Sequence, residues 1–453
     1  MDQVVVLNST SSPSTGKLRG QTDQPPELQL SVVATSRNDD HGGNLLHRMQ
    51  HFVDGFVAQC RRHNVSAELI LVEWNPPADR PSLAEALRWP EDTGPCEIRI
   101  ITVPPAIHGR LGHADRLPLF QMIAKNVGIR RARGRFVLAT NIDIVFSDAI
   151  IRFMRDRLKP GRVYRADRYD VPTGVPQGVP FDDLLAFCER EAFRVNRRDG
   201  NYIRRNSDWV RLPPRNPPLL VRGKTLVRMW WRQELIPLIR RFGRLVRREP
   251  RVMLIELMTG LRRTWQMAIQ ASTGIPRSTR RLARAIVRRW EPSAVRLRVK
   301  LALFKLFRLR LHTNACGDFT LLSRNDWFEL RCYPEWEIFS WHLDSVFIYQ
   351  ADRSGVREVK LDAYMQIYHI EHSTGSGYTP EGMDELFSRI RAKGIPYLTW
   401  EDFLRIVGDM DQQKNAAKQV VYNTDDWGLA GVALPEVTVV PKVGAEAAAG
   451  TRS

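Results

Sequence analysis

The sequence predicts an α/β protein whose mostly parallel sheet is built from two stretches of chain on either side of a basic helical insert. Three observations support this fold class. First, short β-branched runs alternate with segments of helical apolar spacing from residue 28 onward. Second, this alternation stops at about residue 196 and resumes near residue 313. Third, the excess of positive charge lies between these two positions. Ligands of parallel sheets bind at the carboxyl ends of strands, so residues that follow the strands are the first candidates for a site.

The first stretch, residues 28–195, reads as alternating strands and helices. A buried strand is expected where β-branched residues run together and end in polar turn residues, and a helix where apolar residues recur every three or four positions. On these criteria we expect strands at 30–35, 69–72, 98–103 and 135–140, and helices at 44–64 and 119–133.

Residues 196–312 break this rhythm and carry the charge. The whole chain has a formal net charge of +18. Residues 221–310 contain 24 basic and 4 acidic residues, a net charge of +20, so the rest of the chain is nearly neutral. We expect Arg-rich helices here, and three interpretations stay open: a peripheral contact with an anionic membrane surface, which the charge pattern favours, a solvated helical cap, or a nucleic-acid contact. Nucleic acid is disfavoured because the insert has no zinc-finger, RNA-binding aromatic or helix-turn-helix signature.

The amino-acid composition of the whole chain is that of a soluble globular protein, with 43% hydrophobic and 26% charged residues. Five cysteines without C-x-x-C spacing indicate reduced thiols and a cytoplasmic location, peripheral at the inner face of the membrane if the insert binds lipid. No secretory signal or membrane-spanning run is expected. Residues 1–27 and 441–453 are expected to be a disordered leader and tail, and residues 313–440 the second half of the core.

The strongest local signal is the passage from Ala124 to Asp143, in which a helix ends at Gly134, a strand follows, and Asn141-Ile142-Asp143 comes where the strand stops. Residues i and i+2 of an extended chain point the same way, so Asn141 and Asp143 can offer two oxygen ligands to one hard cation. A strand-end turn, where Asn and Asp are common, is the plainer alternative.

This passage resembles the helix-then-D-x-D passage of family 2-like glycosyltransferases with the GT-A fold, a Rossmann-like mixed sheet that binds nucleotide sugars. Lys125-Asn126 stands where the family has Arg-Asn, Asn141 replaces the first Asp, and Asp143 matches the metal-binding Asp. The resemblance implies further donor contacts from the loop after the first strand and from the acid after the second, which are Thr35, Arg37, Asn38 and Glu73.

The passage after the insert resembles the acceptor-side half of GT-A galactosyl- and N-acetylgalactosaminyltransferases. Asp344 matches the Asp of their Glu-Asp pair, although Leu343 replaces the Glu. The resemblance implies that Asp344 is the base of an inverting transfer, which requires a carboxylate to accept the acceptor hydroxyl's proton. A helix N-terminal residue favoured by the dipole is the alternative. Trp336 and Trp341 are candidates for an acceptor subsite, with core packing as the equal alternative.

Two histidines follow an apolar run, in His369-Ile370-Glu371-His372. In the family a His here completes the metal shell, which implies His372 as a ligand and His369 as a second one. Imidazole together with carboxylate suits Mn²⁺ better than Mg²⁺. Gly375-Ser376-Gly377 is a candidate mobile loop over the donor.

The expected function is therefore transfer of a sugar from a nucleotide-sugar donor, with a UDP-sugar as the first candidate, to a hydroxyl of a saccharide or lipid-linked acceptor. A dehydrogenase glycine fingerprint and a hydrolase nucleophile elbow are both absent from the sequence. The alternative is a catalytically degenerate scaffold of the same fold that binds an anionic membrane or nucleic acid through the basic insert. The substitutions at Asn141 and Leu343 keep that alternative open.

Overall fold

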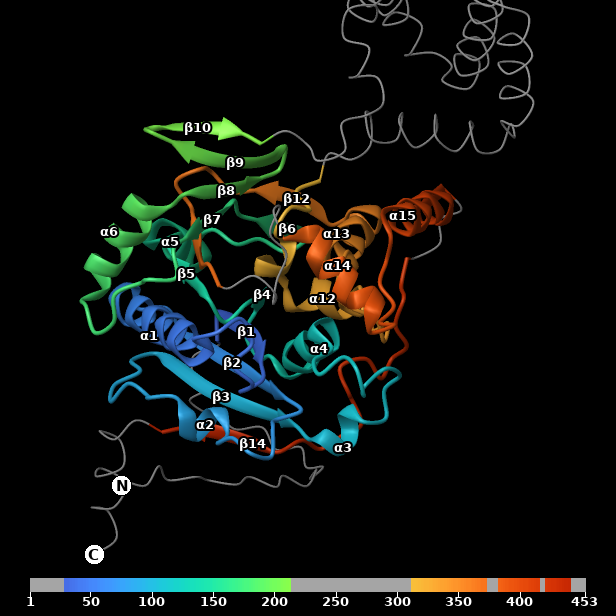
Figure 1. Ribbon diagram of the computed structural model, residues 1–453, viewed down its shortest axis with the longest axis horizontal. Coiled ribbons are helices and arrows are strands. Elements are labelled where there is room, and N and C mark those ends of the chain that lie inside the picture. Colours follow the sequence, from blue (N-terminus) through green and yellow to red (C-terminus); the bar gives the residue numbers. More distant parts are fainter. Residues whose placement is uncertain (1–27, 213–310, 373–381, 416–419, 441–453) are drawn as a thin grey trace, which may run out of the picture. The chain divides into compact units, whose positions relative to one another are not determined.

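The computed structural model describes residues 28–212, 311–372, 382–415 and 420–440, which form a mixed α/β body with two mixed β-sheets (Figure 1). The expectations for the leader, the tail, the helices of the insert and the Gly375–Gly377 loop concern residues outside these ranges. Among the described residues, no helix is long and apolar enough to cross a membrane. All five cysteines are free and buried.

The centre of the larger sheet is four parallel strands, as the sequence predicts. Its strand order is β12-β6-β11-β4-β1-β2-β3-β14, and β4, β1, β2 and β3 are mutually parallel. Helices cover both faces of these strands, which explains why their sequences are continuous apolar runs. Their bounds are β1 (Leu30–Ser36), β2 (Ala67–Trp74), β3 (Cys96–Val103) and β4 (Phe136–Thr140).

Residues that follow the insert in the sequence complete this sheet. Strand β11 pairs antiparallel with β4, with Leu321 opposite Leu138. Segments separated by more than 180 residues are thus direct neighbours in one sheet, as the predicted two-part core requires. The outer strands are β6 (Arg162–Arg165), β11 (Phe319–Ser323), β12 (Arg357–Lys360) and β14 (Glu436–Val439).

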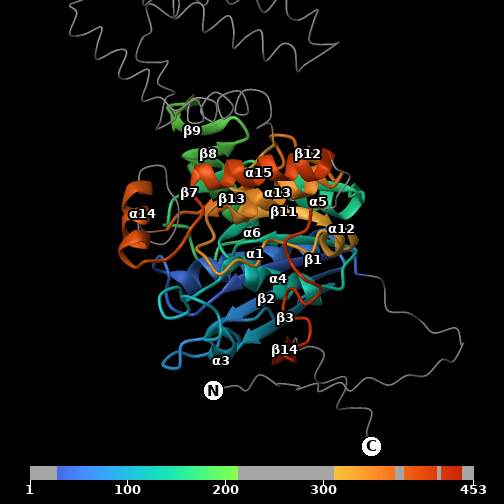
Figure 2. The same cartoon turned by 90° about the vertical axis from the view of Figure 1, so that its right-hand side faces the viewer.

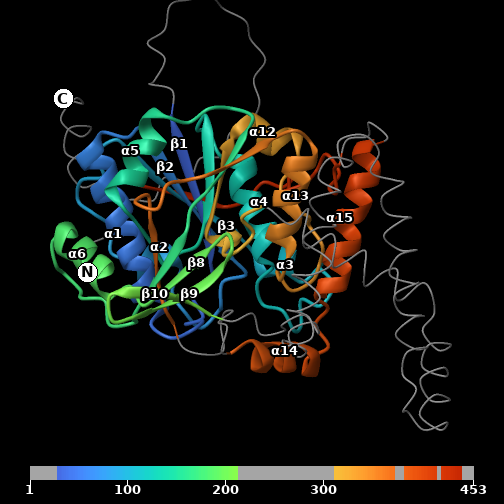
Figure 3. The same cartoon turned by 90° about the horizontal axis from the view of Figure 1, so that it is seen from above.

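Two hydrophobic clusters lie on opposite faces of the sheet. On β1, Val32 packs into one cluster with Phe52, and Val33 into the other with Val127, as the two-residue period of a strand requires. Figure 3 shows α1 and α5 on one side of β1 and β2, and α4, α12 and α13 on the other. These helices are α1 (Leu45–His63), α4 (Gln121–Arg131), α5 (Asp148–Asp156), α12 (Arg324–Glu329) and α13 (Leu343–Arg353).

The second sheet has the order β10-β9-β8-β7-β13-β5 and packs against α6 (Phe181–Glu191). The sequence predicted that the insert starts at residue 196, and this boundary is wrong. Strands β9 and β10 continue the body's sheet, so this part of the body runs to Leu212. The strands are β5 (Ile144–Phe146), β7 (Arg168–Val171), β8 (Arg194–Arg197), β9 (Gly200–Arg205), β10 (Asp208–Arg211) and β13 (Ile367–Ile370).

Shorter elements and the C-terminal helices complete the body. Helix α15 packs against α13 (Figure 2). These elements are α2 (Leu83–Ala86), α3 (Pro105–His108), the 3₁₀ helix η3 (Cys316–Asp318), α14 (Met383–Ala392) and α15 (Trp400–Asn415).

Candidate active site

Strand pairing brings Asp143 and the two histidines together although more than 220 residues separate them. Asp143 immediately precedes β5, and His369 lies on β13, which pairs antiparallel with β5. The backbone N–H of Ile370 donates to the Asp143 carbonyl at 2.9 Å. His372 follows the end of β13, so both imidazoles reach the same carboxylate.

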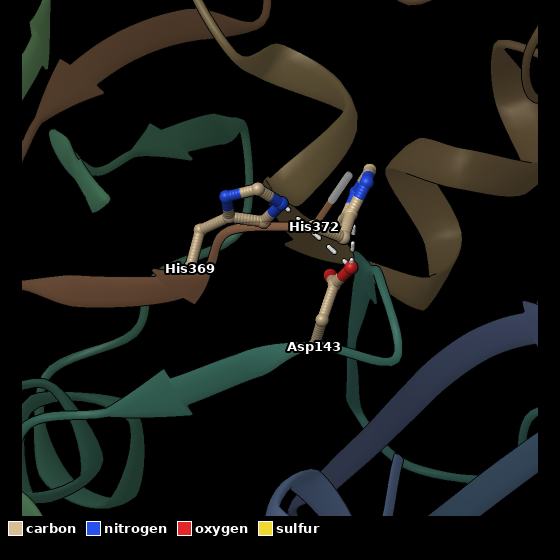
Figure 4. Close-up of side chains that lie close together, drawn as sticks. All are labelled: Asp143, His369 and His372. Atoms are coloured by element: carbon tan, nitrogen blue, oxygen red, sulfur yellow. Dashed lines mark ion pairs between the residues drawn. The ribbon is translucent and has the colours of Figure 1, made fainter. Parts of the chain in front are cut away.

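The three side chains converge on one point (Figure 4). Asp143 Oδ2 lies 3.7 Å from His369 Nε2 and 3.6 Å from His372 Nε2. One ligand atom from each residue lies within 4.8 Å of the others. A carboxylate with two imidazoles is a donor set suited to a divalent transition metal such as Mn²⁺.

One carboxylate oxygen of Asp143 is available as a ligand for a cation. Its side chain is buried, and Oδ1 has no hydrogen-bond partner among the residues that the structure describes. A buried carboxylate oxygen without a partner is costly, and a metal ion would satisfy it. The residues present therefore fit a divalent cation.

The neutral form of His372 fits this role, whereas the carboxylates around His369 favour its protonated form. Burial lowers the pKa of His372 to about 4, so its imidazole is neutral at pH 7, the form that binds metals. Burial and Arg168 lower the pKa of His369, but Asp143 and Asp170 outweigh them and raise it overall. His369 Nδ1 lies 3.1 Å from Asp170 Oδ1, which orients the ring with Nε2 toward Asp143.

Arg48 is a neighbour of Asp143 that the sequence analysis missed. Its Nη1 donates to Asp143 Oδ2 at 2.8 Å, and its Nη2 donates to the His41 carbonyl at 2.6 Å. The place of Arg48 in the sequence was a signal for it, because it lies next to the core residue Met49 on α1. Its side chain is itself buried. Through Arg48 the loop after β1 is held next to Asp143.

Asp344 lies at the start of α13, where its Oδ1 accepts from the Ser345 N–H at 2.7 Å. Gly317 faces it so closely that a Cβ there would come 3.2 Å from Asp344 Oδ2. Burial raises the pKa of the Asp344 carboxyl, against the opposing effects of Cys316, Ser345 and Lys125. A carboxylate with a raised pKa is a better proton acceptor than an ordinary Asp.

Lys125 connects the two parts of the site. Its side chain is fully buried, and Nζ donates to Asn141 Oδ1 at 2.8 Å and to the Gly317 carbonyl at 2.7 Å. Burial lowers the pKa of Lys125 to about 8, although the nearby carboxylates of Asp318, Asp344 and Asp143 counteract this effect. The carboxylates of Asp143 and Asp344 thus both act electrostatically on the ammonium group of Lys125.

Asn141 is held by hydrogen bonds on both sides of its amide. Its Oδ1 accepts from Lys125 and from Gln121 Nε2 at 3.0 Å, and its Nδ2 donates to Asp318 Oδ1 at 2.5 Å. Asp318 in turn accepts from Arg168 at 2.7 Å. The expected sharing of one cation by Asn141 and Asp143 is not the arrangement seen, because these donors occupy the Asn141 oxygen.

The other residues expected to bind the donor lie at the carboxyl ends of β1 and β2 and on α4. Glu73 is buried and accepts from the Leu83 N–H at 2.8 Å, and burial raises its pKa. Asn126 donates to the Tyr333 carbonyl at 2.8 Å and to Glu335. Their roles stay predictions, as do those of Thr35, Arg37 and Asn38, whose side chains donate to the carbonyls of Val72, Asn75 and Pro81.

The two tryptophans expected at an acceptor subsite are partly exposed. Trp336 packs edge-on against Tyr422, with ring centroids 5.3 Å apart. Trp341 contacts Phe387 in the same way at 5.1 Å. Both therefore combine packing with some accessible surface, and their acceptor role stays a prediction.

No family model matches the sequence, and no curated protein matches it. Among solved structures, the chain is similar to GalNAc-T7 with UDP, GalNAc and Mn²⁺, at 11% identity and a TM-score of 0.35 over 90% of this chain and 54% of that one. It is also similar to TarS of S. aureus, at 13% identity and a TM-score of 0.18 over 34% of this chain and 23% of that one. The chain thus matches about half of the first structure's length and less than a quarter of the second's.

Proposed function

We propose that the protein is a metal-dependent glycosyltransferase of the GT-A type, which moves a sugar from a nucleotide-sugar donor to a hydroxyl acceptor with inversion. The observation that carries the proposal is the convergence of Asp143, His369 and His372, with Asp143 three residues after the carboxyl end of the parallel strand β4. Lys125 donates to Asn141, two residues before Asp143, and to the carbonyl of Gly317, which faces Asp344. A UDP-sugar is the first candidate for the donor.

Asp143, His369 and His372 would hold the cation, with Mn²⁺ as the first candidate. A divalent cation there would neutralise negative charge on the departing nucleoside diphosphate. Asp170 keeps His369 in the orientation that presents Nε2, and Arg48 positions the Asp143 carboxylate.

Asp344 would act as the base. It accepts the proton of the acceptor hydroxyl as that oxygen bonds to the anomeric carbon of the donor sugar. The bond from the same carbon to the phosphate oxygen breaks, and its electron pair leaves with the nucleoside diphosphate. The buried surroundings that raise the pKa of Asp344 favour this proton transfer.

Paired variants test the two roles separately. Asp143→Ala should lose Mn²⁺-dependent binding of UDP-sugars in calorimetry. Asp344→Asn should bind the donor normally while turnover falls by about 10²- to 10⁴-fold, the range of general acid–base contributions. Full transfer activity in Asp344→Asn would remove Asp344 from the base role.

A second candidate is a catalytically degenerate scaffold of the same fold. The observation that favours it is the Arg48 guanidinium on Asp143 Oδ2, a positive charge that competes with a metal ion for the same carboxylate. If no UDP-sugar binds to the intact chain with Mn²⁺ or Mg²⁺, the scaffold is the better account.

A further inference from the structure

A groove runs along the outer face of α1, on residues that the proposed reaction does not use. It consists of two hollows of about 200 and 250 Å³. Gln50, Asp54, Ala58 and Arg88 line both hollows, so the two hollows lie side by side along α1. We call them together the α1 groove.

Two small residues of α1, Gly55 and Ala58, shape the walls of the α1 groove. A Cβ at Gly55 would lie only 3.1 Å from the Phe181 ring, so glycine lets α6 approach α1 closely (Figure 3). Ala58, one turn further along α1, fills little of the space between the walls. Phe181 lines the first hollow and Trp89 the second, so each contains an aromatic side chain.

His51 forms part of the wall of the first hollow. Its side chain is 8% exposed, and its Nε2 is closed off from solvent. The groove therefore offers a ligand the exposed side chains of Asp54 and Arg88, and not the ring nitrogen of His51.

The charges of the groove balance. Asp54 and Arg88 carry opposite charges, and Gln50 Nε2 donates to the Asp54 carboxylate at 2.8 Å and to the Arg88 carbonyl at 2.8 Å. Arg61, in the second hollow, is paired with Asp92 at 3.0 Å. An anionic ligand would meet Asp54 and a cationic one Arg88, so an uncharged ligand suits the groove best.

We propose that the α1 groove is a second binding site, which holds an uncharged oligosaccharide. Its hydroxyls would bond to Asp54 and Arg88, and the apolar faces of its rings would lie against Phe181 and Trp89. The groove begins at His47, beside Arg48, whose guanidinium contacts Asp143. The identity of the bound oligosaccharide as acceptor or product rests on the proposed function. The binding of an oligosaccharide to the groove does not.

Binding is tested on the full chain without nucleotide sugar or metal. The probes are maltohexaose, cellohexaose, chitohexaose and mannohexaose, with hyaluronan hexasaccharide as the anionic comparison, in saturation-transfer NMR and calorimetry. We expect at least one uncharged probe to bind. Ala58→Trp, which fills the shared wall, and Asp54→Ala should each weaken that binding, by about tenfold or more for Ala58→Trp, which corresponds to about 1.4 kcal/mol.

Ala186→Trp is the matched control, because Ala186 is exposed on α6 and does not line the groove. It should bind as the wild type does. The proposal is overturned if no uncharged probe binds, if the hyaluronan probe binds instead, or if Ala58→Trp binds normally. The binding test needs neither donor nor metal, so its outcome is independent of the transferase assignment, which Asp344→Asn tests through turnover.

Discussion

At Asn141 the structure gives a physical reason for a departure from the family pattern. The amide Nδ2 donates to Asp318 Oδ1 at 2.5 Å, so an Asp at this position would bring two carboxylates into contact. Asp318 is itself fixed by Arg168. Asparagine is therefore the residue that this polar network accommodates, although the family usually has Asp.

Asn141→Asp should destabilise the protein in a pH-dependent manner. Two carboxylates in contact cannot both ionise, so one of them keeps its proton and has a raised pKa in the folded state. A raised folded-state pKa gives stability that is present at low pH and lost as the pH rises through it. The melting temperature of the variant, relative to wild type, should therefore fall more at pH 8 than at pH 5, and an equal difference at both would contradict this.

Asp170 acts on the predicted metal site through His369. Its Oδ1 faces His369 Nδ1 at 3.1 Å, while Arg194 and Arg168 hold the carboxylate. The sequence offered no signal for this role, because Asp170 lies 199 positions from its partner. Arg48 has a signal in its position on α1, but the sequence does not show that its partner is Asp143, 95 positions away.

Asp170→Asn should weaken Mn²⁺ binding by about 10- to 100-fold, the usual effect of removing a carboxylate that orients a metal-binding histidine. Titration of the purified protein with Mn²⁺, followed by electron paramagnetic resonance, measures the affinity. Asp182→Asn, on the exposed start of α6, is the control and should bind Mn²⁺ as the wild type does. Unchanged affinity in Asp170→Asn would show that His369 does not depend on it.

At the scale of elements, the central strands and their helices were predictable because each carries its signal locally. The expected helix at 119–133 is α4 (Gln121–Arg131), and the expected strand at 135–140 is β4. The insert boundary was misplaced because β9 and β10 contain no buried residue and are rich in arginine, so their composition resembles that of the insert. Only pairing with β8 identifies them as part of the body.

The glycine of the Lys125-Asn126-Val127-Gly128 passage has a packing role. A Cβ at Gly128 would lie 2.5 Å from Val33 Cγ1 and 3.0 Å from Val72 Cγ2, so α4 rests directly on the sheet. This close approach helps to place Lys125, on the same helix, next to Asn141. The resemblance identified the motif, and the packing explains why its last position is glycine.

Gly128→Ala should destabilise the fold by about 1–3 kcal/mol, the cost of overpacking a core. Gly408→Ala is the control, because Gly408 lies within α15 and a Cβ there would meet nothing within 4 Å. That change should stabilise the protein by up to about 1 kcal/mol through helix propensity. Urea denaturation measures both, and equal effects of the two changes would contradict the close packing.

At the scale of the whole molecule, the site depends on how the chain returns to the body after residue 310. His312 is fully buried where it returns, and its Nε2 lies 2.9 Å from Asp167 Oδ1. Arg165 Nε donates to the His312 carbonyl at 2.9 Å. The sequence predicted that both halves form one core, but not which residues join them, because such contacts leave no periodic signal.

The junction at His312 should make the fold sensitive to acid. Burial lowers the pKa of His312 to about 4, despite its bond to Asp167, so the folded state holds it neutral while the unfolded chain protonates it below about 6.5. The unfolded state then binds more protons, and stability falls as the pH drops from about 6.5 to 4. The pKa of Asp167 is lowered instead, because His312 and Lys360 outweigh its burial, so its contribution is lost only at still lower pH.

His312→Gln tests this junction, because glutamine keeps a donor for Asp167 and does not titrate. The variant should be less stable than wild type at pH 7.5, yet its melting temperature should change less between pH 7 and pH 5. The pKa values of His51, which is buried, and His342, which is partly exposed, are also lowered to about 4, so some acid sensitivity should remain. If the pH dependence of the variant matches that of the wild type, proton uptake at His312 is not coupled to unfolding, and the returning chain is held to the body by its backbone contacts instead.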